Sequence, residues 1–135
     1  MMGETDTKKD FSFGKKEKLK SNILIGQLFL EGKSLSVYPL KLIYLKTDIQ
    51  DTQIKTAVTV PKKIFKRAVH RNRIKRLLRE SYRLNKAIIF NNTGDKFAFL
   101  FLYLGKEMPA FVDLESKMKL LLQKFNAQIN EKNNA

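Results

Sequence analysis

The sequence predicts a single domain of the α+β class, in which helices cover a small central sheet. Two segments, Ala68–Asn85 and Asp113–Asn130, repeat apolar residues at helical spacing. Two others, Ile54–Val60 and Phe97–Leu104, are rich in the β-branched and aromatic residues that strands favour. The chain has 135 residues, which is enough for one core without a metal or a disulfide.

The two ends of the chain are polar, and we expect the domain to span residues 17–130. Residues 1–16 are predicted to form a flexible basic arm, and residues 131–135 a frayed tail. Phe11 and Phe13 interrupt the arm next to a basic run. We interpret them as an anchor on the domain, and stacking on nucleotides is the alternative.

A first helix is predicted from Asn22 to about Glu31, because Ser21 is a suitable N-cap and Gly32 a suitable residue to end a helix. Gly26 lies inside this segment and weakens it by about 1 kcal/mol relative to alanine.

Two or three strands are expected before the basic segment and one after it. Ser36–Lys46 is read as one strand in which Leu40, Leu42 and Tyr44 share a face, and Ile54–Val60 is the second, ending before Pro61. A turn signal at 91–95 precedes Phe97–Leu104, which is apolar on both faces and is therefore expected inside the sheet.

The segment from Lys62 to Lys86 holds eleven Lys or Arg and one acid, Glu80. As a helix, Ala68–Asn85 has an apolar face and an opposite polar stripe. The apolar face holds Ile74, Leu77, Leu78, Ser81 and Tyr82, and the stripe holds Asn72, Arg76, Arg79 and Arg83, with Lys75 at its margin. Glu80 has no favourably spaced partner on this stripe. We therefore expect the cations of the stripe to contact a phosphate-rich partner.

The net charge of +14 and the pI near 10 point to a polyanion, with nucleic acid first and anionic membrane second. The most apolar run has eight residues, whereas a spanning helix needs about twenty. The first ten residues lack the apolar core of a signal peptide. We therefore expect a soluble, cytoplasmic chain.

The residues that catalysis would need are sparse. The chain has no cysteine and one histidine, His70, and its acids are scattered without a metal-binding pattern. No phosphate-binding glycine motif is present. We therefore predict a binding protein with no catalytic residue, metal or cofactor of its own.

The string RNRIKRLLRE, Arg71–Glu80, follows Thr59-Val60-Pro61-Lys62-Lys63 at a strand end. This combination strongly resembles the signature of the bacterial ribonuclease P protein subunit, and the resemblance extends from about Leu19 to Ile129. It implies an α/β sandwich with about four strands, three helices and an unusual left-handed βαβ crossover.

The resemblance also implies a function. Members of the family join a catalytic RNA and help it remove the 5′ leader of precursor tRNA, so the partners would be ribonuclease P RNA and that leader. The RNA holds the catalytic metal ions, and Mg²⁺ is expected there. The positions that would grip the catalytic RNA are Lys62, Lys63, Arg67, Arg71, Asn72, Arg73, Lys75, Arg76 and Arg79.

A cleft between the first helix and the sheet would receive the single-stranded leader. Its counterparts here are Ile25, Phe29, Tyr44 and Thr59, and Ile25 stands where the family has an aromatic residue. A shift of one residue would replace Tyr44 with Ile43, and Phe29 could instead belong to the core.

Two other functions remain open to the sequence. A ribosomal-type structural RNA-binding protein, without a role in cleavage, would show the same charges. A duplex-DNA binder is disfavoured, because such proteins place a helix before the recognition helix, whereas here a strand and a proline precede it.

Overall fold

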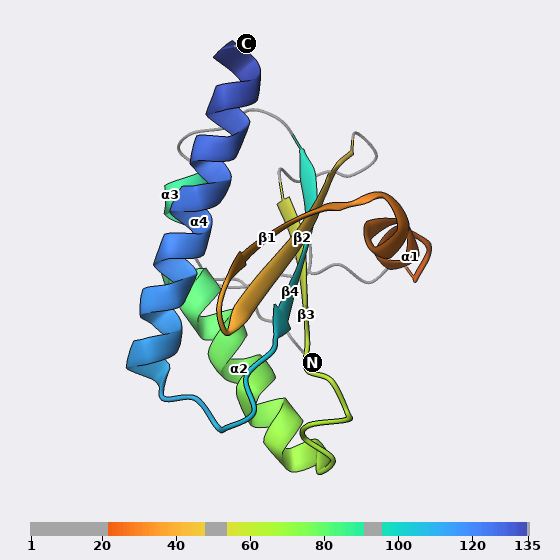
Figure 1. The fold of residues 1–135 in the computed structure, drawn as a ribbon, viewed down its shortest axis with the longest axis vertical. Helices are drawn as coiled ribbons and strands as arrows, with labels where there is room; N and C mark the ends of the chain where they lie inside the picture. The colour runs from red at the N-terminus through yellow and green to blue at the C-terminus, as the bar shows by residue number, and fades with distance from the viewer. Residues whose placement is uncertain (1–21, 48–53, 91–95, 135) are drawn as a thin grey trace, which may run out of the picture.

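A four-stranded mixed sheet with the order β1-β2-β4-β3 forms the centre of the fold (Figure 1). Helices cover both of its faces, as the predicted α+β sandwich requires. The strands are β1 (Lys33–Val37), β2 (Leu40–Lys46), β3 (Ile54–Thr59) and β4 (Phe97–Tyr103). The helices are α1 (Asn22–Glu31), α2 (Ala68–Asn85), the short α3 (Ala87–Phe90) and α4 (Phe111–Asn134).

The computed structural model describes residues 22–47, 54–90 and 96–134. The predicted arm at 1–16 with Phe11 and Phe13, the Ser21 cap and the turn signal at 91–95 lie outside these residues. The division of the chain into arm, domain and tail stays a prediction.

The segment read as one strand from Ser36 to Lys46 is two strands. The chain turns at Tyr38 and Pro39, and β1 and β2 pair antiparallel on either side of this turn. The single-strand prediction was wrong because Val37 and Leu40 flank the turn and keep the segment apolar. Leu40, Leu42 and Tyr44 do share one buried face of β2.

Strand β4 lies inside the sheet as predicted, antiparallel to β2 and parallel to β3. Six of its seven residues are buried, because both of its faces are covered. The chain passes from β3 through α2 to β4, which makes a βαβ unit. Seen from the face that α2 covers, with both strands pointing up, β4 lies left of β3, so the crossover is left-handed (Figure 1).

The larger part of the core lies between the sheet and the pair α2 and α4. Phe99 and Phe101 on β4 and Phe125 on α4 are fully buried there. The Phe99 and Phe125 rings meet edge to face, with centroids 4.9 Å apart. The aromatic residues of β4 are thus core residues, as predicted.

A smaller core lies on the other face, beneath α1. Leu28 is fully buried there against Ile43, Ala98 and Leu100, and Ile25 packs at its edge. Helix α1 contacts β2 and β4, so one short helix covers the middle of this face.

The observed helix ends agree with the predicted ends to different degrees. Helix α2 has the predicted bounds, and α1 ends at Glu31 as expected. Helix α4 begins two residues earlier and ends four residues later than predicted, so it includes 131–134 of the predicted tail. The four-residue α3 was missed, because such a short helix has no measurable apolar period.

Gly32 and Gly26 offer a matched test of how closely α1 packs on the sheet. A Cβ on Gly32 would lie 2.5 Å from the Leu28 carbonyl oxygen and 2.7 Å from Ile43 Cγ2, whereas a Cβ on Gly26 meets nothing within 4 Å. We expect Gly32→Ala to lower the free energy of unfolding by about 1–3 kcal/mol. Gly26→Ala should raise it by about 0.5–1 kcal/mol. Urea unfolding measures both, and equal effects would show that α1 is not seated so closely.

Candidate nucleic-acid interface

The orientation of α2 is set by its apolar face. Ile74, Leu78 and Tyr82 are fully buried against the sheet and α4. The Tyr82 ring lies 5.3 Å from that of Phe101, which fixes the rotation of the helix about its axis. The opposite side of α2 is therefore turned to solvent, as the predicted amphipathic pattern requires.

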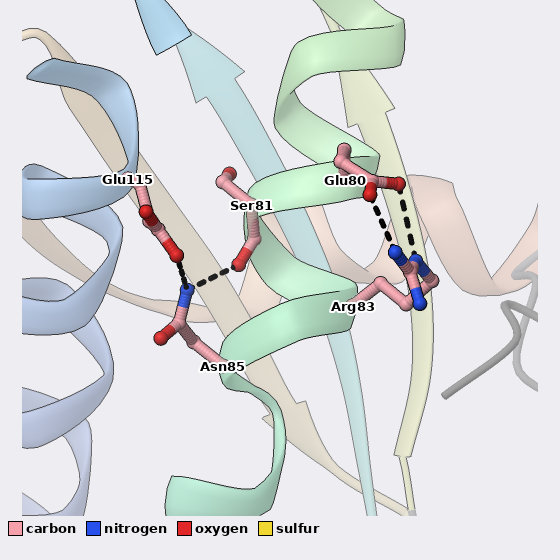
Figure 2. Close-up of polar contacts among 5 residues, drawn as sticks. All are labelled: Glu80, Ser81, Arg83, Asn85 and Glu115. Atoms are coloured by element: carbon pink, nitrogen blue, oxygen red, sulfur yellow. Dashed lines mark hydrogen bonds and ion pairs between the residues drawn. The ribbon is translucent and has the colours of Figure 1, made fainter. Parts of the chain in front are cut away.

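Helix α2 is also joined to α4 by a polar contact (Figure 2). Asn85 Nδ2 donates to the Ser81 carbonyl oxygen at 2.7 Å and to Glu115 Oε2 at 3.2 Å. Figure 2 shows Glu80 and Arg83 on the side of α2 that faces away from α4. One side of the helix thus faces the core and α4, and the other faces solvent.

The solvent side of α2 forms what we call the basic ridge: Asn72, Arg73, Lys75, Arg76 and Arg79. Lys75 is half-buried and the other four are exposed. An open hollow of ≈ 430 Å³ runs along this side, lined by Asn72, Lys75, Arg76, Arg79, Glu80 and Arg83. Four of these six lining residues are cations, so the hollow suits an anion.

Glu80 has a partner, contrary to the sequence analysis. Its carboxylate accepts hydrogen bonds from Arg83 Nε at 3.1 Å and from Arg83 Nη2 (Figure 2). The sequence analysis missed this pair, although Glu80 and Arg83 have the i,i+3 spacing at which side chains on a helix meet. The hydrogen bond with Arg83, aided by its charge, lowers the pKa of Glu80, although burial opposes the shift. Arg83 is therefore partly neutralised, and Arg79 is the last cation of α2 before this pair.

The loop before α2 continues the basic surface. Lys62, Lys63 and Arg67, which the resemblance assigns to the RNA, are all exposed. Lys66, which the resemblance did not include, lies in the same basic run and is also exposed. Arg71 differs from the others, since it is half-buried and its Nη1 donates to the backbone carbonyls of Phe65 and Lys66.

The residues predicted for a leader cleft fall on two different faces. Ile25 and Phe29 lie on α1. Thr59 lies on the face of the sheet that α1 covers, because Thr59 pairs with Leu102 of β4, which packs against the small core. Ile25 and Thr59 are half-buried, whereas Phe29 is 58% exposed, so Phe29 is not a core residue.

Tyr44 is not on this face, and its assignment to the cleft is corrected. It points to the large core, where its ring lies 5.0 Å from that of Phe125, and only 4% of the residue is exposed. Burial raises the pKa of its hydroxyl. Ile43, the alternative, points to the α1 side, but Leu28 packs over it.

Two lysines on the α1 side were not among the predicted cleft residues. Lys41 and Lys55 alternate with the core positions of β2 and β3, so they share the face of Thr59, and both are half-buried. Alternation along each strand already places these lysines on the face opposite the large core. The sequence did not show that α1 covers this face.

The described residues contain no group of three or more His, Cys, Asp or Glu side chains that could hold a metal ion. In the same part of the chain, no helix is long and apolar enough to cross a membrane. His70 is exposed at the start of α2.

The fold and the surface together define a class of protein. It is a small α+β protein with a basic surface, made by one side of a helix and the loop before it, that is complementary to a polyanion.

Comparison with known proteins gives the family. The family model for Ribonuclease P matches residues 13–126. The Ribonuclease P protein component of Porphyromonas gingivalis is 37% identical over 113 residues, covering 81% of this chain and 82% of that protein. The component of Chlorobium phaeobacteroides is 34% identical over 134 residues, covering 89% and 90%.

Solved structures agree with this assignment. The RNase P protein of Thermotoga maritima superposes with a TM-score of 0.62 at 27% identity, over 79% of this chain and 96% of that one. The Staphylococcus aureus protein has the same fold, with a TM-score of 0.67 at 19% identity, over 81% and 94%. The chain belongs to the ribonuclease P protein family.

Family membership decides between the functions that the sequence left open. The chain is a protein subunit of the RNase P endoribonuclease, which acts in 5′ maturation of tRNA. This assignment implies ribonuclease P RNA as a partner.

The pair of Glu80 and Arg83 can be tested by titration. We expect NMR of the Glu80 carboxyl to show a pKa below 4.5, and Arg83→Gln to bring it back toward that value. The pair stabilises the fold at neutral pH, and this contribution is lost as the pH falls through the lowered pKa. It is worth only a few tenths of a kcal/mol, since the pair is at the surface. A pKa unaffected by Arg83→Gln would show that the pair does not form in solution.

Proposed function

We propose that the chain binds the RNA of RNase P through the basic ridge and the loop before α2, and the 5′ leader of precursor tRNA beside α1. The observation that carries this proposal is the orientation of α2. Ile74, Leu78 and Tyr82 on its apolar face are fully buried, and the opposite side carries exposed arginines with Glu80 as the only acid of the helix.

The ridge fits RNA better than it fits an acidic protein surface. A helix of 18 residues is about 27 Å long, so its cations can follow phosphates along a helical RNA. Arginine forks each offer two donors to a phosphate. Phosphate contacts supply affinity and position, whereas the bases of a paired RNA are read poorly through its deep groove. Recognition of shape follows from such a surface.

The leader would lie on the open part of the sheet beside α1. Helix α1 packs on β2 and β4, while Lys55, Ala57 and Thr59 of β3 remain half-buried on that face. A lysine beside small and apolar side chains suits a single strand, since it meets a phosphate while bases rest on apolar surface. Phe29 adds an exposed ring on α1. Because Ile25 stands where the family has an aromatic residue, this chain has one aromatic ring fewer on which a base could stack.

The chemistry would belong to the RNA. Hydrolysis of a phosphodiester with Mg²⁺ needs oxygen ligands that fix the metal ions. We propose that the RNA supplies these ligands, and that the protein contributes affinity for RNA and leader.

Removal of two ridge arginines tests the RNA surface. We expect Arg76→Ala with Arg79→Ala to lower the affinity for ribonuclease P RNA about 10- to 100-fold. The slope of log affinity against log salt should become shallower by roughly 2, because two phosphate contacts are lost. Lys106→Ala with Lys119→Ala removes the same charge from exposed positions outside α2 and is the control. Equal losses in both double variants would mean that net charge, and not the ridge, binds the RNA.

Phe29 tests the leader surface. Phe29→Ala should weaken binding of a precursor tRNA with its leader by about 1–3 kcal/mol, the value of one stacked base, and leave binding of mature tRNA unchanged. Leu30→Ala is the matched control, because Leu30 is the next residue and is 85% exposed. Filter binding of both RNAs to the complex with ribonuclease P RNA measures the difference. If Phe29→Ala weakens both RNAs equally, the leader does not contact Phe29.

A further inference from the structure

The loop between β3 and α2 carries its cations on a backbone that is anchored from within. Lys62, Lys63, Lys66 and Arg67 are exposed, while Phe65 between them is buried and packs on Tyr103 with ring centroids 6.0 Å apart. The Phe65 amide also donates to the Pro61 carbonyl oxygen at 3.3 Å. Two contacts thus hold the first part of the loop.

Arg71 holds the second part. Its Nη1 donates to the carbonyl oxygen of Phe65 at 2.8 Å and to that of Lys66 at 2.9 Å. These carbonyls precede the first turn of α2, so the side chain reaches back along the chain from the helix to the loop. Bonds from a charged donor are stronger than those between neutral groups, and here one nitrogen makes two.

Among the described residues, no side chain caps the start of α2. Arg67 stands at the N-cap with an extended backbone and no side-chain cap, since a guanidinium has no acceptor. The Arg67 carbonyl accepts the amides of His70 and Arg71. Three successive carbonyls, those of Phe65, Lys66 and Arg67, therefore all accept from Arg71, the first two from its side chain and the third from its amide.

We propose that Arg71 is a positioning residue: it braces the loop so that Lys62, Lys63, Lys66 and Arg67 form one continuous cationic surface with the basic ridge. This inference rests on the proposed binding of RNA by that surface. It replaces, for Arg71, the direct RNA contact that the resemblance implies. Arg71 acts on RNA through the loop, whereas Arg76 and Arg79 act on it directly.

The brace can be measured without RNA. In the free chain, Arg71→Ala should raise hydrogen exchange of the Phe65 and His70 amides, which donate to Pro61 and Arg67, about tenfold, because local opening becomes easier. Arg79→Ala removes the same charge from α2 without touching the loop and should leave these amides unchanged. Arg71→Gln is uncharged and too short to reach both carbonyls, so it should match Arg71→Ala and serves if the alanine variant unfolds. Unchanged exchange in the Arg71 variants would overturn the brace.

A double-mutant cycle then tests the effect on RNA. The affinity for purified ribonuclease P RNA is measured for Arg71→Ala and Arg79→Ala, each in the intact chain and with Lys62→Ala and Lys63→Ala. We expect Arg71→Ala to cost about tenfold in the intact chain and less than about twofold without the lysines, since its effect passes through them. Arg79→Ala should cost the same factor in both.

Equal costs of Arg71→Ala in the two backgrounds would overturn the positioning role and restore a direct contact. If the unaltered chain fails to bind this RNA, the proposed function fails, while the exchange experiment still decides whether Arg71 braces the loop.

Discussion

The burial of one side of α2 is the constraint on which the rest of the structure depends. Ile74, Leu78 and Tyr82 are fully buried in the core that α2 shares with the sheet and α4, so α2 cannot rotate without exposing them and burying arginines. Burial of an unpaired charge costs several kcal/mol, more than any single apolar contact returns. The packing of the core and the display of the cations are therefore one property, and a change in the first alters the second.

The two faces of the sheet are covered to different extents. One face is closed by α2 and α4 over a cluster of aromatic rings, and the other is covered at its middle by α1. The open part of the second face and the outer side of α2 are the surfaces that we assign to RNA. The arginines of α2 differ in their contacts. Glu80 partly neutralises Arg83 at one end of the ridge, and Arg71 donates to a backbone carbonyl oxygen of the loop at the other end. Arg73, Arg76 and Arg79, which lie between these two, are exposed.

The sequence predicts those features that depend on periodicity, and misses those that depend on where the chain turns or what lies above a face. The bounds of α2 and the interior position of β4 followed from apolar spacing alone. Tyr44 was misassigned because alternation along β2 separates two faces without saying which helix covers each. The turn at Tyr38 and Pro39 was missed inside an apolar run, and the carbonyl partners of Arg71 exist only in the folded loop.

The central claim is that the protein provides charge and shape while the RNA cleaves. The most direct measurement is release of a 5′ leader of defined length from a precursor tRNA, with the purified protein and ribonuclease P RNA mixed or apart at low Mg²⁺. The account predicts release from the mixture, little from the RNA alone, and none from the protein alone. Leader release by a nuclease-free sample of the protein alone would contradict it.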